Sequence, residues 1–169
     1  MNHVVRYHLD GVTKSLEYDE DADGKKQGKY QSWREDGKPY EECIYKDDRL
    51  HGHYRCWMYD GTLDCECEYR DGALDGYNRT WSRAGTLRRE IHYENGRSHG
   101  PFRLWHRNGK LAQEGTYHQN RRHGLCRTYY PNGVPRSEHT YREGTKVGGF
   151  REWHRNGKLK VEGTYHEAR

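Results

Sequence analysis

The sequence predicts an all-β protein, built as an elongated single-layer antiparallel meander of β-hairpins with a 24-residue period. The first observation is a repeat: "WHRNGKLAQEGTYH" at residues 105–118 returns as "WHRNGKLKVEGTYH" at residues 153–166. The second is spacing, because glycine recurs every 24 residues from Gly28 to Gly148 without an insertion. The third is punctuation by Asn-Gly and Asp-Gly pairs, which mark turns between short segments rich in Tyr, Trp and Thr.

The period divides the chain into a degenerate N-terminal copy and an array of six repeats. Residues 1–27 hold the degenerate copy or cap, in which Tyr7, Gly11 and Tyr18 follow the pattern with one residue lost. The array forms one continuous domain over residues 28–169, with repeats at 28–51, 52–75, 76–99, 100–123, 124–147 and 148–169. Positions within a repeat are counted from its first glycine, so Gly100 is position 1 and Trp105 is position 6.

Composition places the apolar area in aromatic side chains. Aliphatic residues are few, but the chain has 15 Tyr and 5 Trp at a net charge of +4, which predicts a thin core spread along the array. No apolar run is long enough for a signal peptide or a membrane span, so we expect an intracellular, cytoplasmic protein. Membership of a larger assembly, such as a virion, is compatible with this expectation. The five cysteines are odd in number and follow no disulfide framework, which favours a reducing compartment.

One proline selects the type of turn in the hairpins. Pro131 occupies position 8 of the fifth repeat, where a two-residue turn would need a strand N–H that proline lacks. A type I turn followed by a left-handed glycine at position 10 removes the conflict, and it places Trp105 opposite Leu111. We expect the residues of positions 16 and 18 to share the tryptophan face. The position 3 aromatics would then lie on the other face, beside the glutamates of position 15.

The repeats resemble a known family. The segments "GPFRLWHRNGKLAQEGTYHQNRRHG" and "GHYRCWMYDGTLDCECEYRDGALDG" are similar to the variant form of MORN repeats, with the pattern G-x-Y-x-x-W-x-x-N-G-x-L-x-x-E-x-x-Y-x-x-G. The resemblance covers residues 28–169 and, weakly, residues 3–27. It implies a rod of β-hairpins without shared catalytic residues. It also implies a scaffold, a membrane-associated adaptor or a bacterial antitoxin-like protein, and similar arrays occur in large DNA viruses.

Two rows of side chains are candidate partner-binding residues. The arginines of position 4 are Arg55, Arg79, Arg103, Arg127 and Arg151, and the tryptophans of position 6 are Trp33, Trp57, Trp81, Trp105 and Trp153. The arginines fit either stacking on tryptophan together with pairing to a nearby acid, or a row of cations for an acidic peptide, phosphoinositide headgroups or a nucleic acid backbone. The tryptophans fit either the core of the rod or an exposed aromatic ladder.

Catalytic and metal sites are not expected. The glutamates of position 15 recur evenly along the array and make no single pocket, which favours structural pairing. Cys43, Cys65, Cys67 and His51 could form a zinc site, but no C-x-x-C pair supports it, and His51, His99 and His123 share position 24 as a packing repeat. We therefore expect no cofactor, no metal and no small-molecule substrate, and nucleic acid is an improbable partner.

The sequence favours a non-catalytic scaffold or assembly component that binds another protein. The alternatives are a membrane-surface adaptor that binds anionic lipid through the arginine row, and an immunity protein that binds a toxin. The final strand is also expected to be a contact edge for a partner or for self-association, because the sequence ends at Arg169 without a capping segment. Lys158, Lys160 and Val161 are its candidate contact residues, although the lysines also fit a role against uncontrolled pairing.

Overall fold

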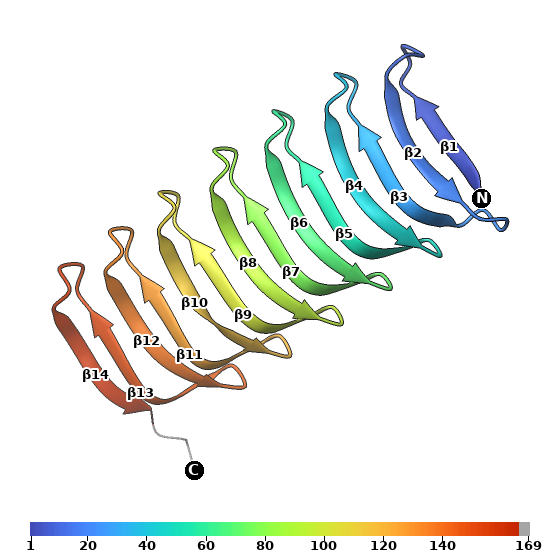
Figure 1. Cartoon of the computed structure of the whole chain (residues 1–169). Helices are drawn as coiled ribbons and strands as arrows, with labels where there is room; N and C mark the ends of the chain where they lie inside the picture. The colour runs from blue at the N-terminus through green and yellow to red at the C-terminus, as the bar shows by residue number, and fades with distance from the viewer. Residues whose placement is uncertain (166–169) are drawn as a thin grey trace. The chain divides into compact units, whose positions relative to one another are not determined.

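The computed structural model describes residues 1–165, which form strands and contain no helix. The chain consists of two compact units, Met1–Gly85 and one that begins at Thr86. Within each unit, consecutive strands pair antiparallel in sequence order, so each hairpin lies beside the next (Figure 1). The predicted all-β meander is therefore confirmed. The described residues include no helix that is long and apolar enough to span a membrane.

The strands recur in pairs, one pair for each repeat. The first unit contains β1 (Asn2–Tyr7), β2 (Lys14–Glu20), β3 (Lys26–Trp33), β4 (Pro39–Lys46), β5 (Arg49–Trp57), β6 (Leu63–Arg70) and β7 (Ala73–Trp81). The second unit contains β8 (Leu87–Glu94), β9 (Arg97–Trp105), β10 (Leu111–His118), β11 (Arg121–Tyr129), β12 (Pro135–Arg142), β13 (Thr145–Trp153) and β14 (Leu159–Tyr165).

The turn inside each repeat has the predicted three-residue form. The Gly109 N–H donates to the His106 carbonyl at 3.0 Å, and the His106 N–H donates to the Lys110 carbonyl at 2.8 Å. Gly109 has a φ of 80°, the left-handed region that glycine reaches without strain. The same pattern recurs at Gly133 and Gly157. Trp105 therefore pairs with Leu111, as predicted from Pro131.

A second turn, of two residues, joins each hairpin to the next. In the loop between β6 and β7, Arg70 pairs with Ala73, and the two residues between them have φ of 50° (Asp71) and 87° (Gly72). Two successive positive φ values are typical of a type I′ turn, whose twist matches that of the strands. This turn explains why Asp, Asn and Gly recur at positions 20 and 21.

The predicted assignment of faces beyond the first turn is wrong. Immediately after the Trp105–Leu111 pair, a β-bulge shifts the register by one residue, because Ala112 has no partner between Leu111 and Gln113. The same shift follows the tryptophan or tyrosine of position 6 in the hairpins β3–β4, β5–β6, β11–β12 and β13–β14. Since side chains alternate between faces, one extra residue exchanges the partners of every later position.

The core consequently contains the position 3 aromatics, not the tryptophans. Phe102, at position 3, is directly opposite Gly115 at position 16, and its ring centroid lies 4.6 Å from that of Tyr117 at position 18. Phe102 is 2 % exposed, whereas Trp105 is only half-buried. Positions 3, 16 and 18 therefore form what we call the core face, which also buries Cys43 and Cys67.

Candidate interaction face

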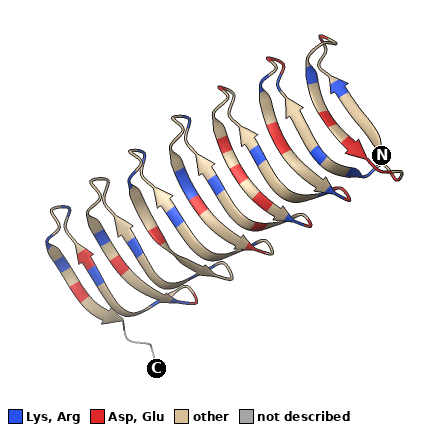
Figure 2. Cartoon of the chain, in the orientation of Figure 1, with Lys and Arg blue, Asp and Glu red and all other residues tan. Residues whose placement is uncertain are grey.

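One charged residue from most strands lines the face opposite the core face. In the second unit, Arg103 lies directly opposite Glu114, Glu114 opposite Arg127, Arg127 opposite Glu138, and Glu138 opposite Arg151. Figure 2 shows the resulting alternation of basic and acidic bands across the strands. We call this row the charge ladder. In the first unit, the ladder consists of Gln31, Glu42, Arg55, Glu66 and Arg79.

The cations of the ladder are compensated by their neighbours. Arg127 donates from Nε to Glu138 Oε1 at 2.8 Å, and its Nη1 lies 3.9 Å from Glu114 Oε1 on the other side. Arg55 donates from both Nε and Nη2 to Glu66 Oε1, at 3.0 and 2.8 Å. The hydrogen bond to Glu138 raises the pKa of the Arg127 guanidinium. The arginine row is thus a series of ion pairs and not a row of isolated cations.

The tryptophan row lies at the strand ends, beside the three-residue turns. The residue at position 7 binds the backbone of the next repeat: Arg34 Nη2 donates to the Trp57 carbonyl at 2.6 Å. His106 Nε2 contacts the Tyr129 carbonyl at 2.8 Å, so the same link recurs in the second unit. These bonds join successive hairpins within a unit. The half-buried indoles border the ladder face without forming the core.

A hollow interrupts the ladder face over β11–β14. Its volume is about 500 Å³, and its lining includes Leu125, Glu138, Arg151 and Glu162. The hollow exists because position 2, which holds Leu125 in the fifth repeat, is Gly149 in the sixth. An added Cβ at Gly149 would meet only the Gly163 carbonyl oxygen, at 3.9 Å. A small apolar surface is therefore exposed between two ladder ion pairs.

Comparison with known families agrees with this repeated geometry. The sequence pattern of the MORN repeat variant matches residues 26–47, 98–119, 122–143 and 146–167, which together make just over half of the chain. The chain belongs to the MORN-repeat family. No curated protein matches it. MORN repeats are typically non-catalytic, and they are generally found in protein-interaction and membrane-binding proteins.

The MORN hairpin also occurs outside the matched ranges. Residues 48–97 carry the same ladder pairs, such as Arg55 opposite Glu66, and the same core pair of positions 3 and 16, Tyr54 opposite Cys67. Tyr54 is in edge contact with Tyr69, with ring centroids 6.0 Å apart. The repeat geometry is therefore retained in copies whose sequence departs from the family pattern.

The cysteines of the array are arranged differently from the sequence expectation. Cys56 and Cys65 lie directly opposite each other in β5 and β6 and form a disulfide. Cys43 and Cys67 are buried on the core face, where burial raises the pKa of the Cys43 thiol to about 12. Because Cys65 is bonded to Cys56, the four-ligand zinc arrangement weighed for this region is wrong. The bulge-dependent register that brings Cys56 and Cys65 together could not be derived from their spacing alone.

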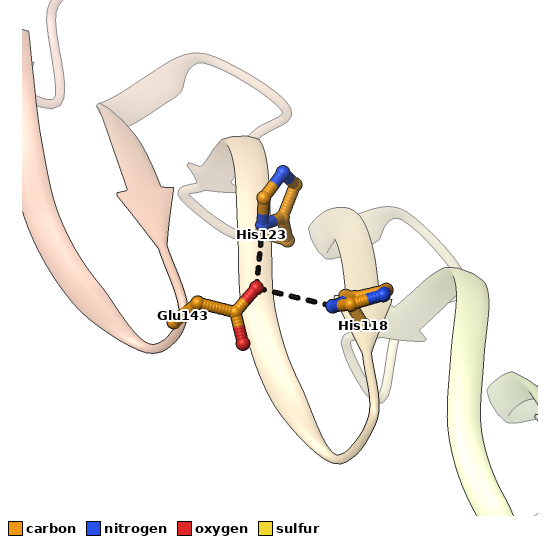
Figure 3. A group of neighbouring side chains, drawn as sticks. All are labelled: His118, His123 and Glu143. Atoms are coloured by element: carbon orange, nitrogen blue, oxygen red, sulfur yellow. Dashed lines mark hydrogen bonds and ion pairs between the residues drawn. The ribbon is translucent and has the colours of Figure 1, made fainter.

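A cluster of imidazoles and a carboxylate lies at the turns of the second unit. His118 Nδ1 is 3.0 Å from Glu143 Oε1, and His123 Nδ1 is 3.3 Å from the same oxygen (Figure 3). Sequence reasoning assigned His123 to a packing repeat and did not single out His118 or Glu143. A sequence signal for this cluster exists. Positions 19 and 24 lie on either side of the two-residue turn, and position 20 of the next repeat lies in the equivalent turn one strand pair later.

The predicted contact residues of the last hairpin lie in and beside β14. Lys158 directly follows the three-residue turn, and its N–H donates to Asn156 Oδ1 at 3.0 Å. Lys160 is the unpartnered residue of the β-bulge, and its Nζ lies 3.7 Å from Glu152 Oε2. Val161 pairs with Glu152 and is 41 % exposed. Their part in binding a partner or a second copy stays a prediction.

Proposed function

We propose that this MORN array is a non-catalytic protein-interaction scaffold or assembly component, and that its ladder face binds another protein. One observation carries the proposal: the ladder alternates in sign, with Arg127 held between Glu114 and Glu138. Such a face offers a guanidinium and a carboxylate in alternation, one on each strand. A protein segment that carries both signs of charge can hydrogen-bond to this face without strong net electrostatic repulsion.

The compensated ladder disfavours the lipid alternative. An anionic headgroup that engages Arg127 must compete with Glu138 at 2.8 Å and approach Glu114 at the same time. Carboxylates within the same row repel a phosphate, so each arginine contributes less attraction than an isolated cation. A membrane-surface adaptor would require a cationic surface elsewhere on the chain.

The hollow at Gly149 is the place where a partner side chain would be anchored. It exposes Leu125, which is 43 % accessible, between the charged groups of Glu138, Arg151 and Glu162. Binding energy at protein interfaces concentrates where one apolar side chain fills a pocket within a polar rim. The proposed anchor is therefore a medium-sized apolar side chain of the partner.

The test fills the hollow without disturbing the fold. Gly149→Tyr places at position 2 the residue that the third repeat carries there, Tyr77, over whose ring Arg79 lies at 4.8 Å. The control is His53→Tyr, which introduces the same residue at position 2 of a repeat in the first unit. Proteins captured from the native source by the wild-type chain are quantified against both variants by mass spectrometry.

We expect at least one captured protein to be lost tenfold or more with Gly149→Tyr and retained with His53→Tyr. Equal capture by all three chains would contradict the proposed binding face. In parallel, sedimentation with vesicles containing phosphatidylserine measures lipid binding. Strong sedimentation that Arg127→Ala and Arg151→Ala abolish would favour the membrane adaptor instead.

A further inference from the structure

Two imidazoles and a carboxylate converge at the edge of the second unit, away from the charge ladder. His118 ends β10, His123 lies in β11, and Glu143 lies in the turn between β12 and β13 (Figure 3). One ligand atom from each of them, a ring nitrogen of each histidine and a carboxylate oxygen, lies within 4.8 Å of the other two. Three separate segments therefore direct nitrogen and oxygen donors toward one point.

The spacing of the donor atoms suits a small tetrahedral cation. Zinc binds imidazole nitrogen and carboxylate oxygen at about 2.0–2.1 Å, so neighbouring ligand atoms in a tetrahedral site lie roughly 3.3 Å apart. The separations from Glu143 Oε1 are 3.0 Å to His118 Nδ1 and 3.3 Å to His123 Nδ1. The three ligand atoms lie within 4.8 Å of one another, and all three side chains are exposed.

We propose that His118, His123 and Glu143 form a binding site for a divalent transition-metal ion of the zinc type. The two Nδ1 atoms and one Glu143 oxygen supply three ligands, and the fourth coordination position stays open for water or for a donor from a partner protein. Two nitrogens and one oxygen favour zinc, nickel or copper over magnesium and calcium, which prefer oxygen ligands alone.

The equivalent positions of the other repeats show that this combination is particular to one place. In the first unit, the same three positions hold Lys46, His51 and Asp71. His51 Nδ1 lies 3.2 Å from Asp71 Oδ1, which reproduces half of the arrangement. The ammonium group of a lysine cannot coordinate a metal ion while it is charged, so Lys46 marks the first-unit turn as a natural control.

The neighbouring side chains leave one carboxylate oxygen to the imidazoles. Glu143 Oε1 contacts both His118 and His123. Arg121 Nη1 lies 4.0 Å from the other oxygen, Oε2, and leaves Oε1 to the imidazoles. His99 offers a further nitrogen ligand nearby, since its ring centroid is 5.2 Å from that of His118. The Nδ1 atom of His99 is buried without a hydrogen-bond partner. Its Nε2 lies 3.8 Å from Glu94.

Calorimetric titration of the full chain with Zn²⁺ tests the site. We expect one ion per chain at pH 7.5, and at least a tenfold loss of affinity in each of His118→Ala, His123→Ala and Glu143→Ala. His118→Lys, which recreates the first-unit arrangement, should abolish binding. His51→Ala is the matched control and should leave the affinity unchanged.

Titration with Co²⁺ gives a second readout, since its visible absorption reports nitrogen and oxygen coordination directly. Circular dichroism confirms that each variant is folded before its affinity is compared. Absence of stoichiometric binding would overturn the proposal. It would equally be overturned by binding that survives His118→Ala and His123→Ala but disappears when the thiols are alkylated, because the ion would then lie at cysteines.

Discussion

Phe102 packs its ring 4.6 Å from the ring of Tyr117, across the β9–β10 pair, and this contact, not the tryptophan row, forms the centre of the repeat. We expect Phe102→Ala to lower the free energy of unfolding by about 3–5 kcal/mol, the range for buried phenylalanine. Trp105→Ala should cost only about 1–2 kcal/mol, since the indole is half-buried. Urea denaturation followed by circular dichroism compares the two, and a larger loss for Trp105→Ala would contradict the assigned core.

Gly115 is opposite Phe102 because no side chain fits there. A Cβ at Gly115 would lie 2.5 Å from Cys126 Sγ and 2.8 Å from Phe102 Cε1. Gly115→Ala should therefore destabilise the chain by about 1–3 kcal/mol through overpacking. Gly149→Ala is the matched control, because its Cβ would meet nothing closer than 3.9 Å. Thermal unfolding of both variants is the measurement, and equal midpoints would show that the core face is looser than described.

The charge ladder makes a prediction about ionic strength. Arg127→Glu would place three carboxylates side by side, with Glu114 and Glu138 as neighbours, and should cost about 1–2 kcal/mol at low salt. The loss should shrink at 1 M NaCl, where the Debye length is about 3 Å. Arg107→Glu, in an exposed turn, should change stability little at either salt concentration. Denaturation at both ionic strengths gives the comparison, and a salt-independent loss would point to packing in place of charge.

The Cys56–Cys65 disulfide predicts a thiol count. Without reductant, three cysteines of the denatured chain should react with a thiol reagent, and after reduction all five should react. Replacing both cysteines by serine should lower stability by about 2–3 kcal/mol, the chain-entropy value for so short a loop. The loss should be absent when wild type and variant are compared in reductant. Five thiols without reductant would contradict the bond.

Alkaline pH should weaken the array through tyrosines that are neutral when folded. Burial, together with the hydrogen bond that Tyr129 Oη donates to Glu114 at 2.7 Å, raises the pKa of Tyr129 to about 12. The unfolded chain loses this proton near pH 10, so the contribution of the neutral phenol is complete below pH 10 and disappears as pH rises toward 12. Burial likewise raises the pKa of Tyr45 to about 12.

Urea midpoints measured from pH 8 to 12 test this titration. We expect the decline above pH 10 to be shallower in Tyr129→Phe, which cannot ionise, although that variant is less stable at pH 8 because its bond to Glu114 is lost. An identical slope in both chains would show that Tyr129 ionises with an ordinary pKa.

The sequence alone determined the hairpin, its period and its turns. Asn-Gly and Asp-Gly pairs encode turn geometry locally, and Pro131 was sufficient to exclude a two-residue turn because a missing N–H is a property of one residue. The pairing of Trp105 with Leu111 followed directly. The glutamates of position 15 likewise indicated structural ion pairing. For the arginines of position 4, such pairing was one of two interpretations.

Only the tertiary structure decided which face is buried. An extra residue such as Ala112 leaves no distinctive mark in the sequence, yet it makes Gly115, and not Glu114, the partner of Phe102. The residues after the bulge therefore lie on the opposite face from the one expected. The Cys56–Cys65 bond depends on the equivalent bulge of β5–β6, and the cluster of His118 and His123 is completed by Glu143 from the next repeat. Neither the bulge nor the position of the next repeat follows from the spacing of these residues.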